Sequence, residues 1–215
     1  MAAIQLCLIT DRTSFGTGAA AIDAVVRLAR DASTAGVDWI QIREKDLSAR
    51  DLCELTRRVV TAASIGSARV LVNDRFDVAL AAGADGVHLT TTSMSARVVR
   101  SAVGSRLAIG ASTHSEAEAM AASEDGTDFV VCGPIFVTPS KAGYSDPLGP
   151  GEVDRIASVA GVPLLALGGI DEQSAGLALG RSVSGIAAIR LFQDAWSSGG
   201  SDELHRVVHR LRLLR

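Results

Sequence analysis

Short apolar runs alternate with longer amphipathic segments from one end of this chain to the other. The runs are apolar at successive positions rather than at every second position, a pattern typical of parallel strands that are covered on both faces. We therefore predict eight strands along the chain. Their ranges are Ile4–Thr10, Trp39–Glu44, Val70–Asp74, Gly86–Thr91, Leu107–Ser112, Phe129–Phe136, Leu164–Ile170 and Ile186–Phe192.

The segments between these runs have the periodicity of amphipathic helices, at about 3.6 residues per turn. Examples are Ala24–Arg30, Asp51–Ala63 and Asp202–Leu214. Some of them end in a small residue and a glycine, as at Ala35-Gly36, and glycine commonly follows the last turn of a helix. Eight strand-helix units predict an α/β fold, specifically a (β/α)8 TIM barrel, with an open doubly wound sheet as the second architecture.

Length and charge narrow the class of protein further. The 215 residues fit a single domain, residues 1–215. A formal net charge of -3, from 21 basic and 24 acidic residues, provides no polybasic surface for nucleic acid or anionic lipid. We therefore expect small-molecule substrates as partners, with no nucleic acid and no membrane, and a homo-oligomer is compatible with the sequence.

The cysteines and the first residues bear on the cellular compartment. Cys7, Cys53 and Cys132 are far apart and form neither a CxxC pair nor a zinc-type cluster, so we expect buried thiols in a reducing compartment. The chain starts without a charged segment followed by an apolar one, and no stretch is long and apolar enough to span a membrane. These features predict a cytoplasmic protein.

The predicted barrel directs attention to the strand ends, because active sites in this fold lie at the carboxyl ends of the strands. Arg43 and Lys45 follow the second strand and are spaced so that both cations lie on the same side of the chain. Such a pair suits an anion, since Arg and Lys both bind phosphate oxygens. The alternative is a structural salt bridge to Glu44 or Asp46.

Asn73 and Asp74 close the third strand. A carboxylate beside an amide oxygen is a plausible start for a Mg²⁺ site that substrate phosphates complete. The alternative is that Asp74 caps the helix predicted over Phe76–Ala82, a frequent role of Asp.

Two later segments are candidates for binding a phosphate. Thr138, Ser140 and Lys141 lie in the loop from Val137 to Pro150, which is long enough for a binding loop, the alternative being a polar turn. Gly168-Gly169 and Ala188-Ile189-Arg190 close the seventh and eighth strands, where barrels often build a phosphate site from backbone N–H groups.

The histidines fall into two groups. His114 follows Ser112-Thr113 after the fifth strand, and His88 lies at the fourth. Either imidazole could move a proton near neutral pH, although a structural histidine at the barrel mouth is the alternative for both. His205 and His209 lie four residues apart on the terminal helix without a neighbouring ligand cluster, and we expect them on the surface.

Taken in order, the strand ends resemble those of the thiamine-phosphate synthase and TenI family. The resemblance covers nearly the whole chain. Its motifs are Gln41-x-Arg43-x-Lys45, Val72-Asn73-Asp74-Arg75, Gly83-Ala84-Asp85-Gly86-Val87-His88-Leu89, Gly133-Pro134-Ile135-Phe136-x-Thr138-x-Ser140-Lys141 and Ala166-Leu167-Gly168-Gly169-Ile170.

The resemblance implies an enzyme of thiamin biosynthesis, a transferase that joins a pyrimidine methyl pyrophosphate to a thiazole phosphate and releases pyrophosphate. It implies that Gln41 and Ser112 meet the pyrimidine and that Asp74 binds Mg²⁺. The residues implied to hold the pyrophosphate are Arg43, Lys45, Asn73 and Lys141. Those implied to receive the thiazole phosphate are Thr138, Ser140, Gly168, Gly169 and the end of strand eight, Ile189 and Arg190.

The chain departs from the synthase pattern at two places. Where synthases carry an acidic second Mg²⁺ ligand, this chain has Thr90-Thr91-Thr92-Ser93, so that Ser93 replaces a carboxylate. Arg190 stands where a small residue, often Ser, usually faces the thiazole phosphate. It could grip the phosphate or fill the pocket.

The departures keep other functions open. TenI-type members lack the metal carboxylates and are thiazole tautomerases, an isomerase activity that would use His114 here. A barrel that binds a thiamin precursor without catalysis is a further alternative, because a fold does not by itself define a function. An unrelated phosphosugar enzyme would leave Arg43, Lys45 and Lys141 without a role.

Overall fold

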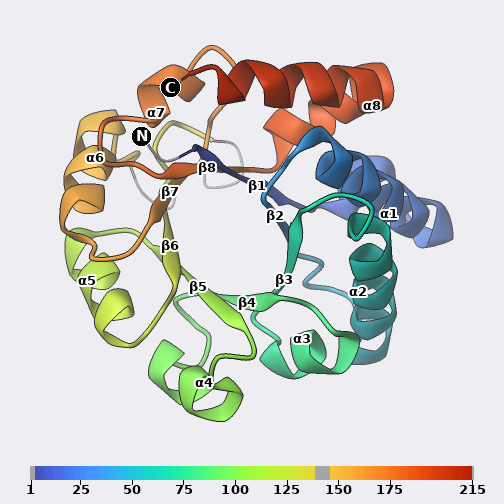
Figure 1. Cartoon of the computed structure of the whole chain (residues 1–215), viewed down its shortest axis with the longest axis horizontal. Helices are drawn as coiled ribbons and strands as arrows, with labels where there is room; N and C mark the ends of the chain where they lie inside the picture. The colour runs from blue at the N-terminus through green and yellow to red at the C-terminus, as the bar shows by residue number, and fades with distance from the viewer. Residues whose placement is uncertain (1–2, 139–145, 215) are drawn as a thin grey trace.

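The computed structural model describes residues 3–138 and 146–214, and within them eight parallel strands form a closed barrel (Figure 1). The strands follow one another in chain order around the barrel, and the last pairs with the first. They are β1 (Gln5–Ile9), β2 (Trp39–Ile42), β3 (Arg69–Asn73), β4 (Gly86–Leu89), β5 (Ala108–Thr113), β6 (Phe129–Cys132), β7 (Leu164–Leu167) and β8 (Gly185–Ala188). The predicted (β/α)8 barrel is confirmed.

Helices alternate with the strands and surround the barrel (Figure 1). A short 3-10 helix, η1 (Arg12–Phe15), precedes the first of them. The helices are α1 (Gly18–Ala35), α2 (Ala49–Ala63), α3 (Phe76–Ala82), α4 (Ala96–Val103), α5 (Glu116–Glu124), α6 (Pro150–Val159), α7 (Ala175–Ala178) and α8 (Arg190–Arg212). No helix in the described ranges is long and apolar enough to cross a membrane.

Two apolar layers explain why the strands are apolar at successive positions. Along β1, Leu6 and Leu8 pack outward in the core shared with the helices. Cys7 and Ile9 point the other way and join a second cluster inside the barrel. Because side chains alternate across a strand, a strand that contributes to both layers has no polar face.

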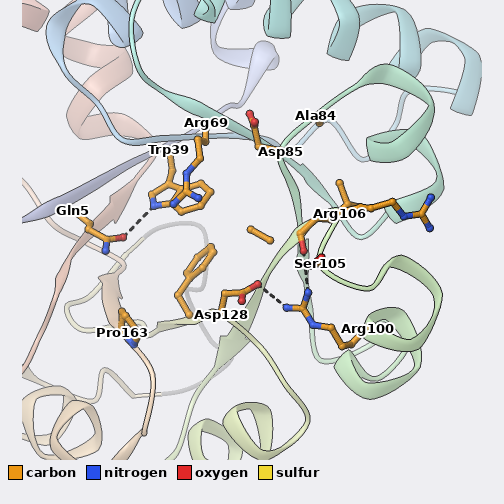
Figure 2. A pocket seen from close by; sticks show the side chains of 13 residues that line it. Gln5, Trp39, Arg69, Ala84, Asp85, Arg100, Ser105, Arg106, Asp128 and Pro163 are labelled. Carbon is orange, nitrogen blue, oxygen red and sulfur yellow. Dashed lines mark hydrogen bonds and ion pairs between the residues drawn. The ribbon is translucent and has the colours of Figure 1, made fainter.

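Side chains at the amino ends of the strands close one end of the barrel interior (Figure 2). The rings of Trp39 and Phe129 stack with their centroids 5.2 Å apart. The Arg69 guanidinium lies 3.6 Å from the centre of the Trp39 ring, and the indole N–H donates to Gln5 Oε1 at 3.1 Å. Both aromatic rings are buried.

A cavity of about 480 Å³ opens over these rings, and its charged side chains hold strand ends together (Figure 2). Asp85 accepts the amide of Val70 at 2.7 Å, and Asp128 accepts the amide of Ile109 at 2.7 Å. Arg100 donates to Asp128 at 2.6 Å. These contacts stabilise the barrel, as expected for the amino-terminal face of this fold.

All eight predicted strands form, but β6, β7 and β8 end three or four residues earlier than predicted, and the other boundaries differ by at most two residues. Strand β6 ends at Cys132 rather than Phe136, because Pro134 has no N–H for the sheet ladder. The eighth strand ends at Ala188, and Phe192 lies on α8, where it is fully buried. The apolar run therefore crosses a strand-helix boundary.

Other details agree with the sequence. The segment predicted over Asp202–Leu214 forms the second half of α8, which has non-helical backbone at Gly199 and Gly200. The three cysteines are free thiols, Cys7 and Cys132 being buried and Cys53 half-buried. His205 and His209 are exposed.

Barrel closure predicts a strong effect of one methyl group. A Cβ added at Gly185 would lie 1.9 Å from the Gln5 carbonyl oxygen, so Gly185→Ala forces β8 away from β1. We expect the free energy of unfolding to fall by about 3 kcal/mol or more, near the upper end for overpacking. Denaturant unfolding measures this loss.

Gly151→Ala is the matched control. Gly151 lies in the first turn of α6, and an added Cβ would meet nothing within 4 Å. We expect a stability equal to or slightly above that of the wild type, since alanine favours helix more than glycine does. Equal losses in the two variants would contradict the role of Gly185 in closure.

Candidate functional site

Three adjoining cavities lie at the carboxyl ends of the strands. The central cavity has a volume of about 210 Å³ and is lined by residues at the ends of β1 to β7. A metal-side cavity of about 300 Å³ shares Lys45, Asn73 and Thr90 with it, and a glycine-side cavity of about 230 Å³ shares Leu167. The central cavity is lined by the predicted residues Gln41, Arg43, Lys45, Asn73, His88, Ser112 and His114.

Arg43 and Lys45 both line the central cavity, as the sequence pattern predicts. The alternative of a structural salt bridge to Glu44 or Asp46 is wrong, because Arg12 faces both acids instead. Among the described residues, no carboxylate forms an ion pair with Arg43 or Lys45. The cavity is therefore lined by two cations, and no carboxylate among the described residues neutralises their charge by an ion pair.

Gln41 and Asn73 meet at the ends of β2 and β3. The Gln41 Nε2 group donates to Asn73 Oδ1 at 3.2 Å. Gln41 Oε1 is buried and has no hydrogen-bond partner among the described residues. A buried acceptor without a partner is costly, so the cavity offers a position for a ligand donor.

His88 and Ser112 form a pair across β4 and β5. The distance between His88 Nε2 and Ser112 Oγ is 2.9 Å. Burial, with a smaller contribution from the positive charge of Arg43, lowers the pKa of His88 to about 4. The imidazole is thus neutral at pH 7 and orients the serine hydroxyl at the edge of the cavity.

His114 is more exposed than His88 and lies where β5 ends and α5 begins. Glu118 Oε2 accepts the backbone N–H of His114 at 2.7 Å and lies 3.2 Å from its Nδ1. The carboxylate therefore fixes the imidazole beside the cavity, which is an arrangement suited to proton transfer.

Asp74 lines the metal-side cavity together with Asn73, Thr90 and Thr92. It has a positive φ of 66°, which non-glycine residues seldom adopt. The alternative role as a helix cap is wrong, because the N-cap of α3 is Arg75 and has no side-chain cap bond. The backbone conformation instead places Asp74 at the mouth, where its side chain is exposed.

The residues of this cavity fit Mg²⁺ only in a shared site. They supply hard oxygen donors, but the described residues contain no group of three or more His, Cys, Asp or Glu side chains that could hold a metal. Ser93 Oγ accepts the amide of Thr90 at 2.8 Å and thereby serves the loop itself. A metal bound through Asp74 would need substrate oxygens and water as its remaining ligands.

The glycine-side cavity joins the ends of β7 and β8. Gly168 and Gly169 have φ values of 105° and 67°, and an added Cβ at Gly169 would lie 2.6 Å from the Val137 carbonyl oxygen. Only glycine fits such a conformation at such close approach. Both glycines line the cavity, which leaves their backbone accessible to a ligand.

Helix α8 begins at the same cavity, with Ile189 as its N-cap and Arg190 as its first residue. The N-cap makes no side-chain hydrogen bond to the helix. An uncapped helix N-terminus is a favourable place for an anion. The structure corrects the prediction that Arg190 ends a strand, and places this exposed cation at the helix start.

Two predicted site residues, Ser140 and Lys141, lie outside the described residues. Thr138 is described, lies almost buried, and lines the glycine-side cavity. The start of the loop, at Thr138, therefore contributes to the wall of this cavity.

Four residues of this region were not predicted as site residues. Asp11 lines the glycine-side cavity and Thr113 the central one, while Thr10 and Glu44 lie buried behind Arg43. Each stands at or just after a strand end, which is the signal that could have identified them. Their importance depends on which neighbour each side chain meets, and strand position does not give that.

The fold and the cavities at its carboxyl end together define a (β/α)8 barrel in which Arg43 and Lys45 line a polar central cavity and two glycines line an adjoining one. The family model described as thiamine monophosphate synthase, TMP-TENI, matches residues 6–192. The chain belongs to this family, as its motifs predict.

Individual relatives agree. A Geobacter sulfurreducens protein is 44% identical over 86% of this chain and 84% of its own length. The thiamine-phosphate synthase of Chlorobium luteolum is 39% identical over 86% of this chain and 82% of its own length. The solved thiamine phosphate pyrophosphorylase of Pyrococcus furiosus superposes with a TM-score of 0.81 at 30% identity, over 97% of this chain and 96% of that one.

The depressed pKa of His88 predicts a pH-dependent stability. The unfolded chain binds a proton at His88 below about pH 6.5, whereas the folded protein binds it only near pH 4. Stability from this group is therefore complete above pH 6.5 and decreases as the pH falls towards 4. The total loss is about 3 kcal/mol.

Urea unfolding at several pH values measures the effect, with His88→Gln as the comparison. We expect a smaller decrease in stability for the variant over the same pH range. An NMR titration of the wild-type protein reports the imidazole directly. A His88 pKa near 6.5 would contradict the prediction.

Proposed function

We propose that this chain is a thiamine-phosphate synthase, a transferase that couples hydroxymethylpyrimidine pyrophosphate to thiazole phosphate and releases pyrophosphate. The observation that carries the proposal is the pair of cations Arg43 and Lys45, which line the polar cavity and form no ion pair with an acid in the part of the chain that the structure describes. The glycine-side cavity provides a second anion position next to it. Two anionic substrates can thus meet with their rings between the two positions.

The pyrimidine would lie in the central cavity. Gln41 Oε1 is a buried acceptor without a partner among the described residues, and it suits an amino group on the pyrimidine ring. Ser112, oriented by neutral His88, supplies a hydroxyl on the other side. These contacts orient the methylene carbon that carries the pyrophosphate.

The leaving pyrophosphate would lie against Arg43, Lys45 and Asn73, with Lys141 as a further cation. The bond from the methylene carbon to the pyrophosphate oxygen breaks, and that oxygen keeps the electron pair. The thiazole nitrogen then donates its lone pair to the methylene carbon. Positioned cations stabilise the charge that develops on the leaving group.

Asp74 would hold a Mg²⁺ ion, which would supply further positive charge at the leaving group. Asn73 and the hydroxyls of Thr90 and Thr92 line the same cavity. With Ser93 in place of a second carboxylate, the metal depends on substrate oxygens for its affinity.

The thiazole phosphate would occupy the glycine-side cavity. Gly168, Gly169 and Ile189 offer backbone, and Thr138 and Ser140 offer hydroxyls. Arg190 would add a cation at the start of α8, where it favours a phosphate that the helix N-terminus also attracts. This arrangement leaves the ring directed towards the central cavity.

A thiazole tautomerase is the second candidate, and one observation favours it. Glu118 fixes the His114 imidazole beside the central cavity, so that this side chain could move a proton on the thiazole ring. A barrel that binds thiamin precursors without catalysis would be the remaining case.

The free thiols support a cytoplasmic location, since the cytosol keeps cysteines reduced. The closure of β8 on β1 supports one domain for residues 1–215.

We expect Arg43→Ala to lower the rate of thiamine phosphate formation on the order of 100-fold or more, because a positioned charge is lost from the leaving group. Purified protein is supplied with both substrates and Mg²⁺, and the product is quantified. Arg27→Ala, which removes an exposed arginine from α1 on the outside of the barrel, is the control and should keep the wild-type rate. A wild-type rate in R43A would contradict the proposed role.

His114→Asn separates the two candidate reactions. If the chain is a synthase, the variant keeps its rate of coupling, because no step of that reaction uses the imidazole as a base. Thiazole phosphate tautomerisation is measured on the same samples by NMR. A wild-type protein that tautomerises the substrate without coupling, and loses this activity in H114N, would establish the second candidate instead.

A further inference from the structure

Arg43 is attached to the rest of the barrel through a buried chain of hydrogen bonds. The Arg43 backbone N–H donates to Thr10 Oγ1 at 3.1 Å, and the Thr10 hydroxyl donates to Glu44 Oε1 at 2.6 Å. Thr10 is completely buried and Glu44 nearly so. These hydrogen bonds join the end of β1 to the residues that directly follow β2.

Glu44 receives a second donor from the loop after β1. The backbone N–H of Arg12 lies 3.1 Å from each carboxylate oxygen of Glu44, and the Arg12 guanidinium also faces the carboxylate, 4.0 Å away. Burial raises the pKa of Glu44, whereas these donors favour its ionised form. A buried carboxylate held by several donors has little freedom to move.

The direction of these side chains separates the acid from the cations. Gln41, Arg43 and Lys45 line the central cavity, whereas the Glu44 carboxylate accepts hydrogen bonds from Thr10 and Arg12 and borders the adjoining metal-side cavity. Alternation along extended chain accounts for the difference. Since Arg12 also pairs with Asp46, both neighbouring acids have partners outside the central cavity, and Arg43 and Lys45 stay available there to an anion.

We propose that Thr10 and Glu44 are positioning residues, which fix the backbone at Arg43 and keep Arg43 and Lys45 directed at the pyrophosphate group of the substrate. Neither residue is assigned contact with substrate. The inference rests on the proposed function for the identity of the anion, and on the hydrogen bonds described above for the geometry.

Thr10→Val tests the role of these hydrogen bonds. Valine has nearly the same shape as threonine, but it can neither accept a hydrogen bond from the Arg43 N–H nor donate one to Glu44. We expect inorganic pyrophosphate, added with Mg²⁺, to bind about tenfold more weakly by calorimetry. We expect kcat/KM for the pyrimidine pyrophosphate to fall on the order of 10- to 100-fold, as for a displaced catalytic group. The KM for thiazole phosphate should not change.

Thr10→Ser keeps the hydroxyl and should restore both values. Thr56→Val is the matched control, because Thr56 is equally buried but its hydroxyl donates to Leu52 within α2. We expect T56V to alter the melting temperature without changing pyrophosphate affinity. If T10V fails to fold, Glu44→Gln replaces it, since glutamine keeps the volume and exchanges one acceptor oxygen for a donor.

The outcomes are distinguishable. A folded T10V or E44Q protein that binds pyrophosphate as tightly as the wild type would overturn the positioning role and leave the proposed function intact. Equal losses of affinity in T10V and T56V would also overturn it, because the effect would then follow stability alone. A wild-type protein that binds no pyrophosphate would overturn the proposed function, and this inference with it.

Discussion

Closure of β8 on β1 is the constraint on which the rest of the molecule depends. Gln5 faces Gly185 across the last strand pair, and the absence of a side chain at Gly185 lets the two backbones meet. Because the strands are parallel and the barrel is closed, the carboxyl ends of all eight converge on one mouth. Side chains distant in sequence, such as Arg43 and Arg190, thereby come to line adjoining cavities.

Acidic side chains have different partners at the two ends of the barrel. At the amino ends, Asp85 and Asp128 accept strand amides and Arg100 pairs with Asp128. At the carboxyl ends, Glu44 and Asp46, the acids next to Arg43 and Lys45, form ion pairs with Arg12. The first arrangement stabilises the fold, and the second leaves positive charge available for a ligand. The same residue types thus serve structure at one end and binding at the other.

Strand positions were predictable from the sequence because these strands are buried on both faces, which gives uninterrupted apolar runs. Strand ends were less predictable, since Phe192 continues such a run although it lies on a helix. The rule that sites lie at carboxyl ends located Arg43, Asn73 and Gly168 in advance. It did not find Thr10 or Glu44, because their roles depend on contacts between neighbouring strands that no spacing along the chain specifies.

A crystal structure of the wild-type protein with pyrophosphate, thiazole phosphate and Mg²⁺ tests the account of two anion positions most directly. We expect the pyrophosphate beside Arg43 and Lys45 and the thiazole phosphate against Gly168, Gly169 and the start of α8. Anions bound only at the opposite, amino-terminal end of the barrel, or two substrates competing for one position at the mouth, would contradict it.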